Sequence, residues 1–324
     1  MSNKVLLSSK DLSIGYGNKE ILKDLKLEIK SGDVICLMGP NGSGKSTLLK
    51  TFVGLLKPLK GEVKILGRIL KDLDHKELSK LVSVVLTERG NINGLTVEDI
   101  VRLGRFPHTN MWGKLEEKDR RIIKECIELL NLESLKSELA SELSDGQLQK
   151  VFIARALAQD APLIILDEPT TFLDISNKME LMAILDRISK ARNKALLFSS
   201  HDWELALEMC PKVWLIDSTN SVISGTPEEF LYTGVIQKLF MHERFYLNNN
   251  NGRFCELKER TQKLKFKCDN SVVTEWVDHA LSKIGYKIES EADLSVVFYE
   301  NKFKVEGGAE FQSLSDLLDY LKLR

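Results

Sequence analysis

The chain has 324 residues, of which 43% are hydrophobic and 29% are charged, and its formal net charge is −1 at pH 7. This length suffices for one full domain and a smaller companion, because single cores stop growing at about 250 to 300 residues. A nearly neutral charge supplies no field that attracts nucleic acid, so no nucleic-acid partner is expected.

The sequence also bears on where in the cell the chain is expected and on the redox state of its cysteines. The first ten residues, MSNKVLLSSK, lack the apolar core of a signal peptide. The longest apolar runs, such as Val34–Met38, are strand-length and far short of the ~20 residues that span a bilayer. Five cysteines, an odd number, form no C-x-x-C pair, so we expect reduced thiols inside the cell. Any membrane role therefore needs a membrane-spanning partner.

The N-terminal part predicts strands followed by a helix. Leu25, Leu27 and Ile29 alternate with polar residues, as in a half-buried strand. Val34–Met38 is continuously apolar, as in a strand covered on both faces. Apolar residues at helical spacing then occupy residues 48–56.

A glycine-rich loop, GPNGSGKST, joins this strand to this helix. It matches G-x-x-x-x-G-K-S in the context that the motif requires, so it predicts a site for a nucleoside triphosphate. Backbone N–H groups and the helix dipole would surround the phosphates, Lys45 would neutralise the γ-phosphate, and Ser46 would offer its hydroxyl to Mg²⁺. The predicted nucleotide-binding residues are Gly39, Pro40, Asn41, Gly42, Ser43, Gly44, Lys45, Ser46 and Thr47.

A mainly helical insertion is expected over residues 90–142, and the segment LSDGQLQK follows it. Ser144, Asp145 and Gly146 suggest a tight turn that presents backbone N–H groups, and Gln147 would open the next helix. Such a helix start is a second anion site.

Polar residues follow two further buried strands. Asp167 and Glu168 come directly after Leu163–Leu166, and His201 closes the strand at residues 195–198. Strands that alternate with helices predict an α/β fold with a mostly parallel sheet, whose ligands collect at the carboxyl ends of the strands. We expect Asp167 to bind Mg²⁺ and Glu168 to act as general base on the attacking water. His201 would contact the γ-phosphate or hold Glu168 and the water.

The polar run NNNNG (residues 248–252) predicts a boundary between a domain at residues 1–247 and another at 252–324. Beyond it, residues 264–268 alternate as a strand, residues 273–284 carry a helical stripe, a hairpin is centred on Asn301, and residues 314–321 form a last helix. This pattern predicts a small α+β domain.

GPNGSGKST, LSDGQ, ILDEPT, FLD and SSHD occur in this order, and with them the chain resembles the ATP-binding cassette (ABC) ATPases over residues 4–231. The resemblance implies a P-loop NTPase with a helical subdomain that hydrolyses ATP with Mg²⁺. Tyr16 in IGYG matches the aromatic residue that stacks on adenine. LSDGQ is implied to bind ATP held by a second copy, in a head-to-tail homodimer that buries two nucleotides.

The resemblance also assigns residues to the dimer interface. Ser144, Gly146 and Gln147 would hold the γ-phosphate across the interface, and Asp174 would link the two halves. Asp145 replaces a glycine of the commoner LSGGQ pattern, so its carboxylate must point away from the phosphates. The Gln that the family usually uses for Mg²⁺, water and coupling falls at Thr87. Thr87, a neutral oxygen donor, or Glu88, a charged one, would replace it only in part.

The segment LGRFPHTNMWGKL (residues 103–115) resembles the GR-[FY]-P-H segment of importer ATPases for iron-siderophores, haem and cobalamin. In those proteins a groove receives a short cytoplasmic helix of the permease. Phe106, Met111 and Trp112 would be its apolar anchors, or members of an internal core cluster. The implied subunit lies on the cytoplasmic side of the inner membrane, with integral permease subunits and, indirectly, a periplasmic substrate-binding protein as partners.

Other functions stay open at this level. A soluble cassette ATPase can act as an assembly or scaffold factor, as in iron–sulfur cluster biogenesis. An export ATPase usually carries fused membrane helices, which this sequence lacks. The domain at 252–324 lies outside the core family pattern and would be a regulatory ligand-binding domain, a dimer-stabilising module or a passive appendage.

Overall fold

The computed structural model describes residues 4–86, 92, 94–110, 113–240, 245–248, 253–256 and 260–323. The chain divides into two units: the first extends to Phe240, and the second contains Met241–Asn248 and Arg253–Arg324. Strand β12 (Phe245–Asn248) pairs with β13 (Arg253–Glu256) and so belongs to the second unit, although the sequence assigned residues 245–247 to the first.

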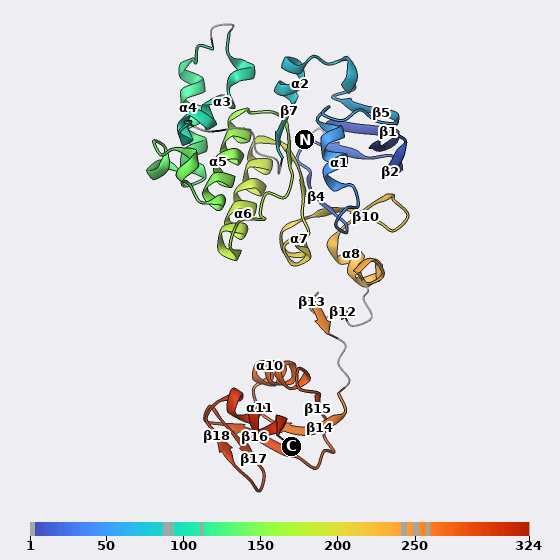
Figure 1. The fold of residues 1–324 in the computed structure, drawn as a ribbon, viewed down its shortest axis with the longest axis vertical. Coiled ribbons are helices and arrows are strands. Elements are labelled where there is room, and N and C mark those ends of the chain that lie inside the picture. Colours follow the sequence, from blue (N-terminus) through green and yellow to red (C-terminus); the bar gives the residue numbers. More distant parts are fainter. Residues whose placement is uncertain are drawn as a thin grey trace. The chain divides into compact units, whose positions relative to one another are not determined.

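A six-stranded sheet forms the centre of the first unit, in the order β11-β10-β4-β9-β8-β7 (Figure 1). Neighbouring strands are parallel except for the pair β10 and β11. Every residue of β4 and β8 is buried, as their continuous apolar runs predicted. The predicted mostly parallel sheet is therefore confirmed. Its strands are β4 (Val34–Met38), β7 (Val82–Val85), β8 (Leu163–Leu166), β9 (Ala195–Ser199), β10 (Lys212–Ile216) and β11 (Val222–Gly225).

A second, antiparallel sheet of this unit was not predicted. It contains β1 (Val5–Tyr16), β2 (Lys19–Leu25), β3 (Glu28–Lys30), β5 (Lys60–Ile65) and β6 (Arg68–Ile69). The single strand expected through Leu25, Leu27 and Ile29 is wrong, because Leu25 ends β2 and Ile29 lies in β3. Both β2 and β3 pair with the long strand β1. Leu25, Leu27 and Ile29 are therefore all buried, although they do not belong to one continuous strand.

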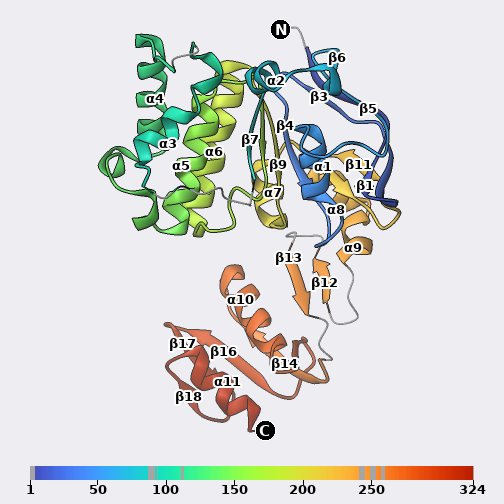
Figure 2. The same cartoon turned by 45° about the horizontal axis from the view of Figure 1, so that its top comes forward.

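Helix α1 (Lys45–Phe52) lies between the two sheets of the first unit (Figure 2). Leu48, Leu49 and Phe52 are fully buried in one cluster with residues of both sheets. The Phe52 ring meets the edge of Trp214 with a centroid distance of 6.3 Å. Since α1 continues directly from the glycine-rich loop, this packing holds the loop at the sheet.

The remaining helices of the first unit surround the sheets. They are α2 (His75–Leu81), α3 (Val97–Leu103), α4 (Glu117–Leu129), α5 (Asp145–Ala158), α6 (Ile175–Arg192), α7 (Trp203–Met209), α8 (Pro227–Tyr232) and α9 (Val235–Phe240), with 3-10 turns η1 (Leu70–Asp72), η2 (Phe106–His108), η3 (Glu133–Leu135) and η4 (Ala140–Glu142). Helices α3, α4 and α5 pack together, and α3 and α4 lie within the predicted helical insertion. Within the described ranges, none of the helices is both long and apolar enough to cross a membrane.

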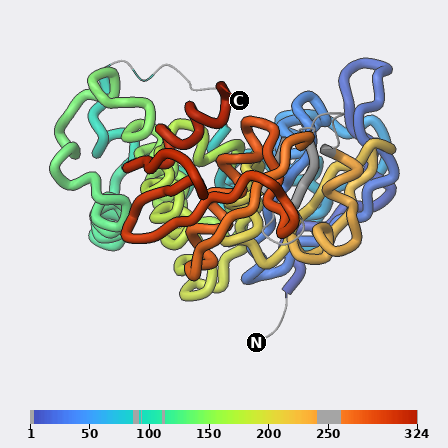
Figure 3. The backbone as a smooth tube through the Cα atoms, turned by 90° about the horizontal axis from the view of Figure 1, so that it is seen from below, coloured from blue at the N-terminus to red at the C-terminus, as the bar shows by residue number. Residues whose placement is uncertain are grey.

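The second unit contains a five-stranded sheet in the order β15-β14-β16-β17-β18. Its elements are β14 (Gln262–Lys267), α10 (Ser271–Ser282), β15 (Tyr286–Ile288), β16 (Ser295–Tyr299), β17 (Lys302–Val305), β18 (Glu310–Phe311) and α11 (Leu314–Lys322). Both helices pack on the sheet, through a core that includes Leu264, Leu281 and Leu317. Figure 3 traces these segments in orange and red. The expected hairpin turns at Glu300 and Asn301, which have positive φ angles of 45° and 60°.

Candidate functional site

The glycine-rich loop occupies the carboxyl end of β4 and the N-terminus of α1. Gly39, Gly42 and Gly44 have φ angles of 155°, 77° and 104°, which favour glycine. A Cβ atom on Gly39 would lie 2.9 Å from Ile216 Cβ, and one on Gly44 would lie 2.6 Å from Ile21 Cγ2. The backbone therefore approaches its neighbours too closely for a side chain, and it presents the first N–H groups of α1 at the loop.

Lys45 folds back over this loop. Its Nζ donates hydrogen bonds to the carbonyl oxygens of Gly39 at 2.9 Å and Pro40 at 3.2 Å. Burial lowers the pKa of Lys45, and the negative charges of Glu168 and Asp167 oppose that shift. Ser46 is exposed in the first turn of α1. A cation and a hydroxyl thus lie at this loop.

Ser199 connects the Asp167 carboxylate with the backbone of Glu168. Its Oγ donates to Asp167 Oδ1 at 2.6 Å and accepts from the Glu168 N–H at 2.8 Å. Asp167 is buried, and its N–H donates to the Val85 carbonyl at 2.8 Å. Ser199 had no role in the sequence-based prediction, and its only signal was its place at the end of the neighbouring strand. It orients Asp167 and Glu168 together.

Glu168 and His201 face each other. Glu168 has a φ of 49°, a conformation that costs on the order of 1–3 kcal/mol for a non-glycine residue and turns the chain sharply after β8. Its carboxylate accepts a hydrogen bond from Thr171 Oγ1 at 2.9 Å and lies 3.6 Å from His201 Nδ1. The side chain of His201 is 57% exposed. Glu168 and His201 therefore lie close together at the carboxyl ends of β8 and β9, and solvent can reach them.

The start of α5 differs from its prediction. The helix begins at Asp145, two residues before the expected Gln147, so Ser144 is its N-cap and no separate tight turn precedes it. Ser144 Oγ accepts from the Gln147 N–H at 3.3 Å, and Gln147 Oε1 accepts from the Ser144 N–H at 2.9 Å. This capping box explains the shift, because it satisfies N–H groups that a turn would leave unpaired.

Gly146 lies against the FLD segment of the same chain. A Cβ atom on Gly146 would lie 3.1 Å from the Phe172 carbonyl oxygen and 3.3 Å from Leu173 Cδ2. Asp174, the third residue of FLD, caps α6 by accepting from the Asn177 N–H at 2.8 Å. Hydrogen bonds from Asn177 lower the pKa of Asp174 and keep it ionised.

The residues named from the sequence thus form two groups. Lys45, Asp167, Glu168 and His201 gather at the carboxyl ends of β4, β8 and β9, which are neighbours in the sheet. Ser144–Gln147 starts helix α5, and Figures 1 and 2 show α5 and α1 separated by strands of the parallel sheet. The two groups of residues therefore lie on different sides of that sheet.

Several other predicted residues have distinct surroundings. Tyr16 ends β1 with 53% of its surface exposed. Phe106 is 71% exposed, so the alternative of an internal core cluster is wrong for this residue. Thr87, Glu88, Met111 and Trp112 lie outside the described residues.

Comparisons with known proteins decide the family. The ABC transporter family model matches residues 22–171, which include the glycine-rich loop, the start of α5 and the acidic pair. An uncharacterized ABC transporter ATP-binding protein of Methanocaldococcus jannaschii is 43% identical over 235 residues, which cover 72% of this chain and 81% of that protein. The chain belongs to the ABC transporter ATP-binding proteins.

Two further comparisons extend this assignment. An iron(3+)-hydroxamate import ATP-binding protein of Bacillus subtilis is 35% identical over 72% of this chain and 87% of that protein. A dimeric ATP-binding cassette in a post-hydrolysis state, bound to ADP and Pi, is similar in structure, with a TM-score of 0.61 and 29% identity over 68% of this chain and 99% of that chain. The predicted ABC ATPase fold and ATP-hydrolysing activity are confirmed, and this ABC ATPase binds ATP.

Proposed function

We propose that this chain is the ATP-hydrolysing subunit of an importer for an iron-siderophore, haem or cobalamin, and that two copies act on a separate membrane permease. The observation that carries the proposal is the exposed Phe106 within the importer-like segment GRFPH. The relative that acts in iron(3+)-hydroxamate import supports the iron-siderophore class. The subunit would lie on the cytoplasmic side of the membrane and depend indirectly on a periplasmic substrate-binding protein.

The geometry supports a composite nucleotide site. The loop at residues 39–47 and Lys45 would hold the phosphates of ATP, and Glu168, oriented with His201, would accept a proton from the attacking water. Ser144, Gly146 and Gln147 of the second copy would approach the same γ-phosphate, with Asp174 at the contact between the halves. Hydrolysis then lets the halves separate, and this motion would drive the permease.

Mg²⁺ fits the oxygen donors of this site. The Ser46 hydroxyl and the Asp167 carboxylate would hold it beside the phosphates, where it would neutralise developing charge. No cluster of three or more His, Cys, Asp or Glu side chains suited to a metal occurs in the described part of the chain. Such a site suits a cation that takes most of its ligands from phosphate and water. Thr87 or Glu88 would add one further oxygen.

Adenine stacking gives one testable consequence. We expect Tyr16→Ala to raise the Kd for ATP about tenfold, because stacking of a base on an aromatic ring contributes about 1–3 kcal/mol. Titration with a fluorescent ATP analogue and competition by ATP measure this change. Tyr232→Ala is the matched control, since Tyr232 on α8 is 74% exposed and far along the sequence from the loop. Equal affinities for the two variants contradict the role of Tyr16.

The surface around Phe106 suits a helix of the permease. Phe106 borders a hollow of about 250 Å³ with Leu95, Leu103 and Leu115, and a second hollow of about 400 Å³ with His75 and Pro107. Phe106 lines both hollows and is exposed. It can therefore serve as an apolar anchor for a helix that lies across them.

We expect Phe106→Asp to abolish co-sedimentation of the subunit with membranes that contain the permease, because a buried charge at an apolar anchor costs several kcal/mol. The permease is the integral membrane protein that co-purifies with the wild-type chain, and sedimentation is compared with and without its co-production. Leu55→Asp is the control, as Leu55 is 64% exposed in the loop after α1. A wild-type chain that never co-purifies with a membrane protein overturns the import function.

A further inference from the structure

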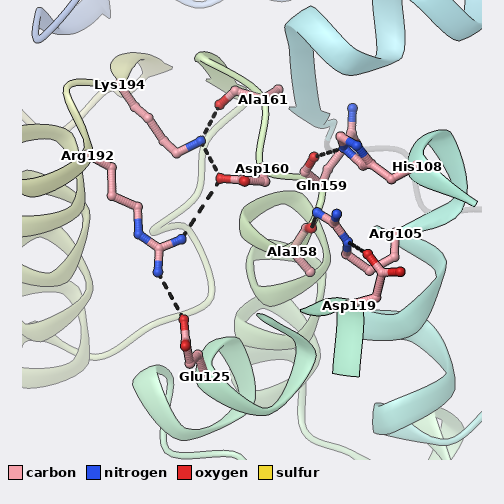
Figure 4. A network of polar contacts seen from close by, with 10 residues as sticks. All are labelled: Arg105, His108, Asp119, Glu125, Ala158, Gln159, Asp160, Ala161, Arg192 and Lys194. Atoms are coloured by element: carbon pink, nitrogen blue, oxygen red, sulfur yellow. Dashed lines mark hydrogen bonds and ion pairs between the residues drawn. The ribbon is translucent and has the colours of Figure 1, made fainter. Parts of the chain in front are cut away.

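The segment Gly104–His108 contacts the C-terminal end of α5 as well as solvent. A Cβ atom on Gly104 would lie 2.2 Å from the Arg155 carbonyl oxygen, so only glycine lets the end of α3 approach α5 this closely. Arg105 Nη1 donates to the Ala158 carbonyl at 2.7 Å, and His108 Nε2 donates to the Gln159 carbonyl at 2.8 Å (Figure 4). These two carbonyls belong to the last turn and C-cap of α5, where intrahelical donors run out.

Arg105 is itself held by a buried acid. Its Nε donates to Asp119 Oδ1 at 2.9 Å, and the two side chains are 4% and 7% exposed. Burial alone would raise the pKa of Asp119, but hydrogen bonds from the Glu116 N–H and from Arg105 outweigh burial and hold that pKa below its ordinary value. Arg105 therefore links the start of α4 to the end of α5 through a guanidinium fork that a lysine cannot reproduce.

The same end of α5 is attached on two further sides. The Gln159 side-chain Nε2 donates to the carbonyls of Ser79 at 2.5 Å and Val82 at 2.8 Å, which joins α5 to α2 and β7. Lys194 and Arg192 pair with Asp160 at 2.8 and 3.9 Å, on the side of α6 and β9 (Figure 4). The C-terminal end of α5 is therefore the point where the helical region, the parallel sheet and α6 meet.

The opposite end of this helix carries Ser144–Gln147. Helix α5 has 14 residues, so its ends are about 21 Å apart, and most of the residues between them are buried. A buried helix that is capped at both ends moves as one body, since its core contacts do not deform continuously. A shift of the Ala158 and Gln159 carbonyls therefore displaces Ser144 and Gly146.

We propose that Gly104, Arg105 and His108, supported by Asp119, form a positioning device that sets the place of α5 and thereby of Ser144–Gln147. Phe106 lies between Arg105 and His108 in the sequence and is exposed. A partner seated against Phe106 thus acts on α5 through its neighbours. This coupling to a permease rests on the proposed function, whereas the positioning of α5 does not.

The first test uses the full-length chain alone. Arg105→Lys is expected to raise the protein concentration for half-maximal ATP hydrolysis about tenfold, because a charged hydrogen bond at the α5 terminus is lost. The Kd for ATP in dilute protein should stay within about twofold, since Lys45 and its loop lie on another helix. His108→Ala should also raise the protein concentration for half-maximal hydrolysis. Because His108 is exposed, this variant keeps the test valid if Arg105→Lys fails to fold. Arg121→Lys on the exposed face of α4 is the control.

Two further measurements, amide exchange and permease-stimulated hydrolysis, test the proposal. Amide exchange of residues 144–150 in the presence of ATP should be faster in Arg105→Lys and His108→Ala than in Arg121→Lys. Unchanged exchange there, with only a lower Tm, shows a merely structural role and overturns the positioning of α5. With the permease present, Arg105→Lys should still bind membranes but lose permease-stimulated hydrolysis. If the permease still stimulates hydrolysis by Arg105→Lys, the coupling is overturned. If the wild-type chain does not bind membranes that contain the permease, the proposed function is rejected, but the positioning of α5 is not.

Discussion

Replacing Glu168 by Gln is expected to lower the rate of ATP hydrolysis by about a hundredfold to ten-thousandfold, which is the usual contribution of a general base. Glu168 follows β8, and its carboxylate lies 3.6 Å from His201 Nδ1. Gln keeps the size of the side chain and an oxygen that can accept from Thr171 Oγ1, so the local backbone should persist. The substitution removes the negative charge and, with it, the capacity to take a proton from water.

The same variant should retain ATP and accumulate as a dimer. In the proposed composite site, ATP that is not hydrolysed would continue to link the loop of one copy to the start of α5 of the other. Size-exclusion chromatography with ATP and Mg²⁺ measures the dimer, and a phosphate-release assay measures hydrolysis. Glu208→Gln, at an exposed position on α7, is the control and should match the wild type. Hydrolysis by Glu168→Gln at the wild-type rate would refute the general-base role.

Replacing Gly146 by Asp is expected to prevent this dimer and to lower hydrolysis about a hundredfold, because a like charge facing an anion costs several kcal/mol. The monomer should still bind ATP, since Gly146 lies at the start of α5 and the glycine-rich loop at the start of α1. The neighbouring Asp145 is exposed and natural to the chain. The effect therefore depends on which of these two positions would face the nucleotide.

Gly146→Ala separates charge from packing. A Cβ atom here lies 3.1 Å from the Phe172 carbonyl and 3.3 Å from Leu173 Cδ2, so alanine requires a shift of a few tenths of an ångström and should reduce hydrolysis only modestly. Chromatography of Glu168→Gln with and without Gly146→Asp, both with ATP, measures the dimer directly. A dimer that persists in the double variant contradicts the composite site.

Local patterns predicted the central sheet and the residues at its carboxyl edge. Continuous apolar runs identified β4 and β8, and the polar residues that end β8 and β9 proved to be neighbours, because parallel strands bring their carboxyl ends to one edge. The antiparallel sheet was missed. Its β1–β2 hairpin is local, with Tyr16 opposite Lys19, but the pairing of β1 with β5 places Leu7 opposite Ile65, far along the chain. The short-range periodicity of a sequence does not show which distant strands will pair.

The sequence by itself determined the chemistry available: a phosphate loop, an acidic pair, a histidine and a second helix start, each specified by residues a few positions apart. Only the tertiary structure decided that Ser199 joins the Asp167 carboxylate to the Glu168 N–H, that Phe106 is exposed, and that Arg105 and His108 cap α5. Arg105 and Ala158 are 53 positions apart. Contacts of this kind depend on how helices pack, and packing is settled by the whole core at once.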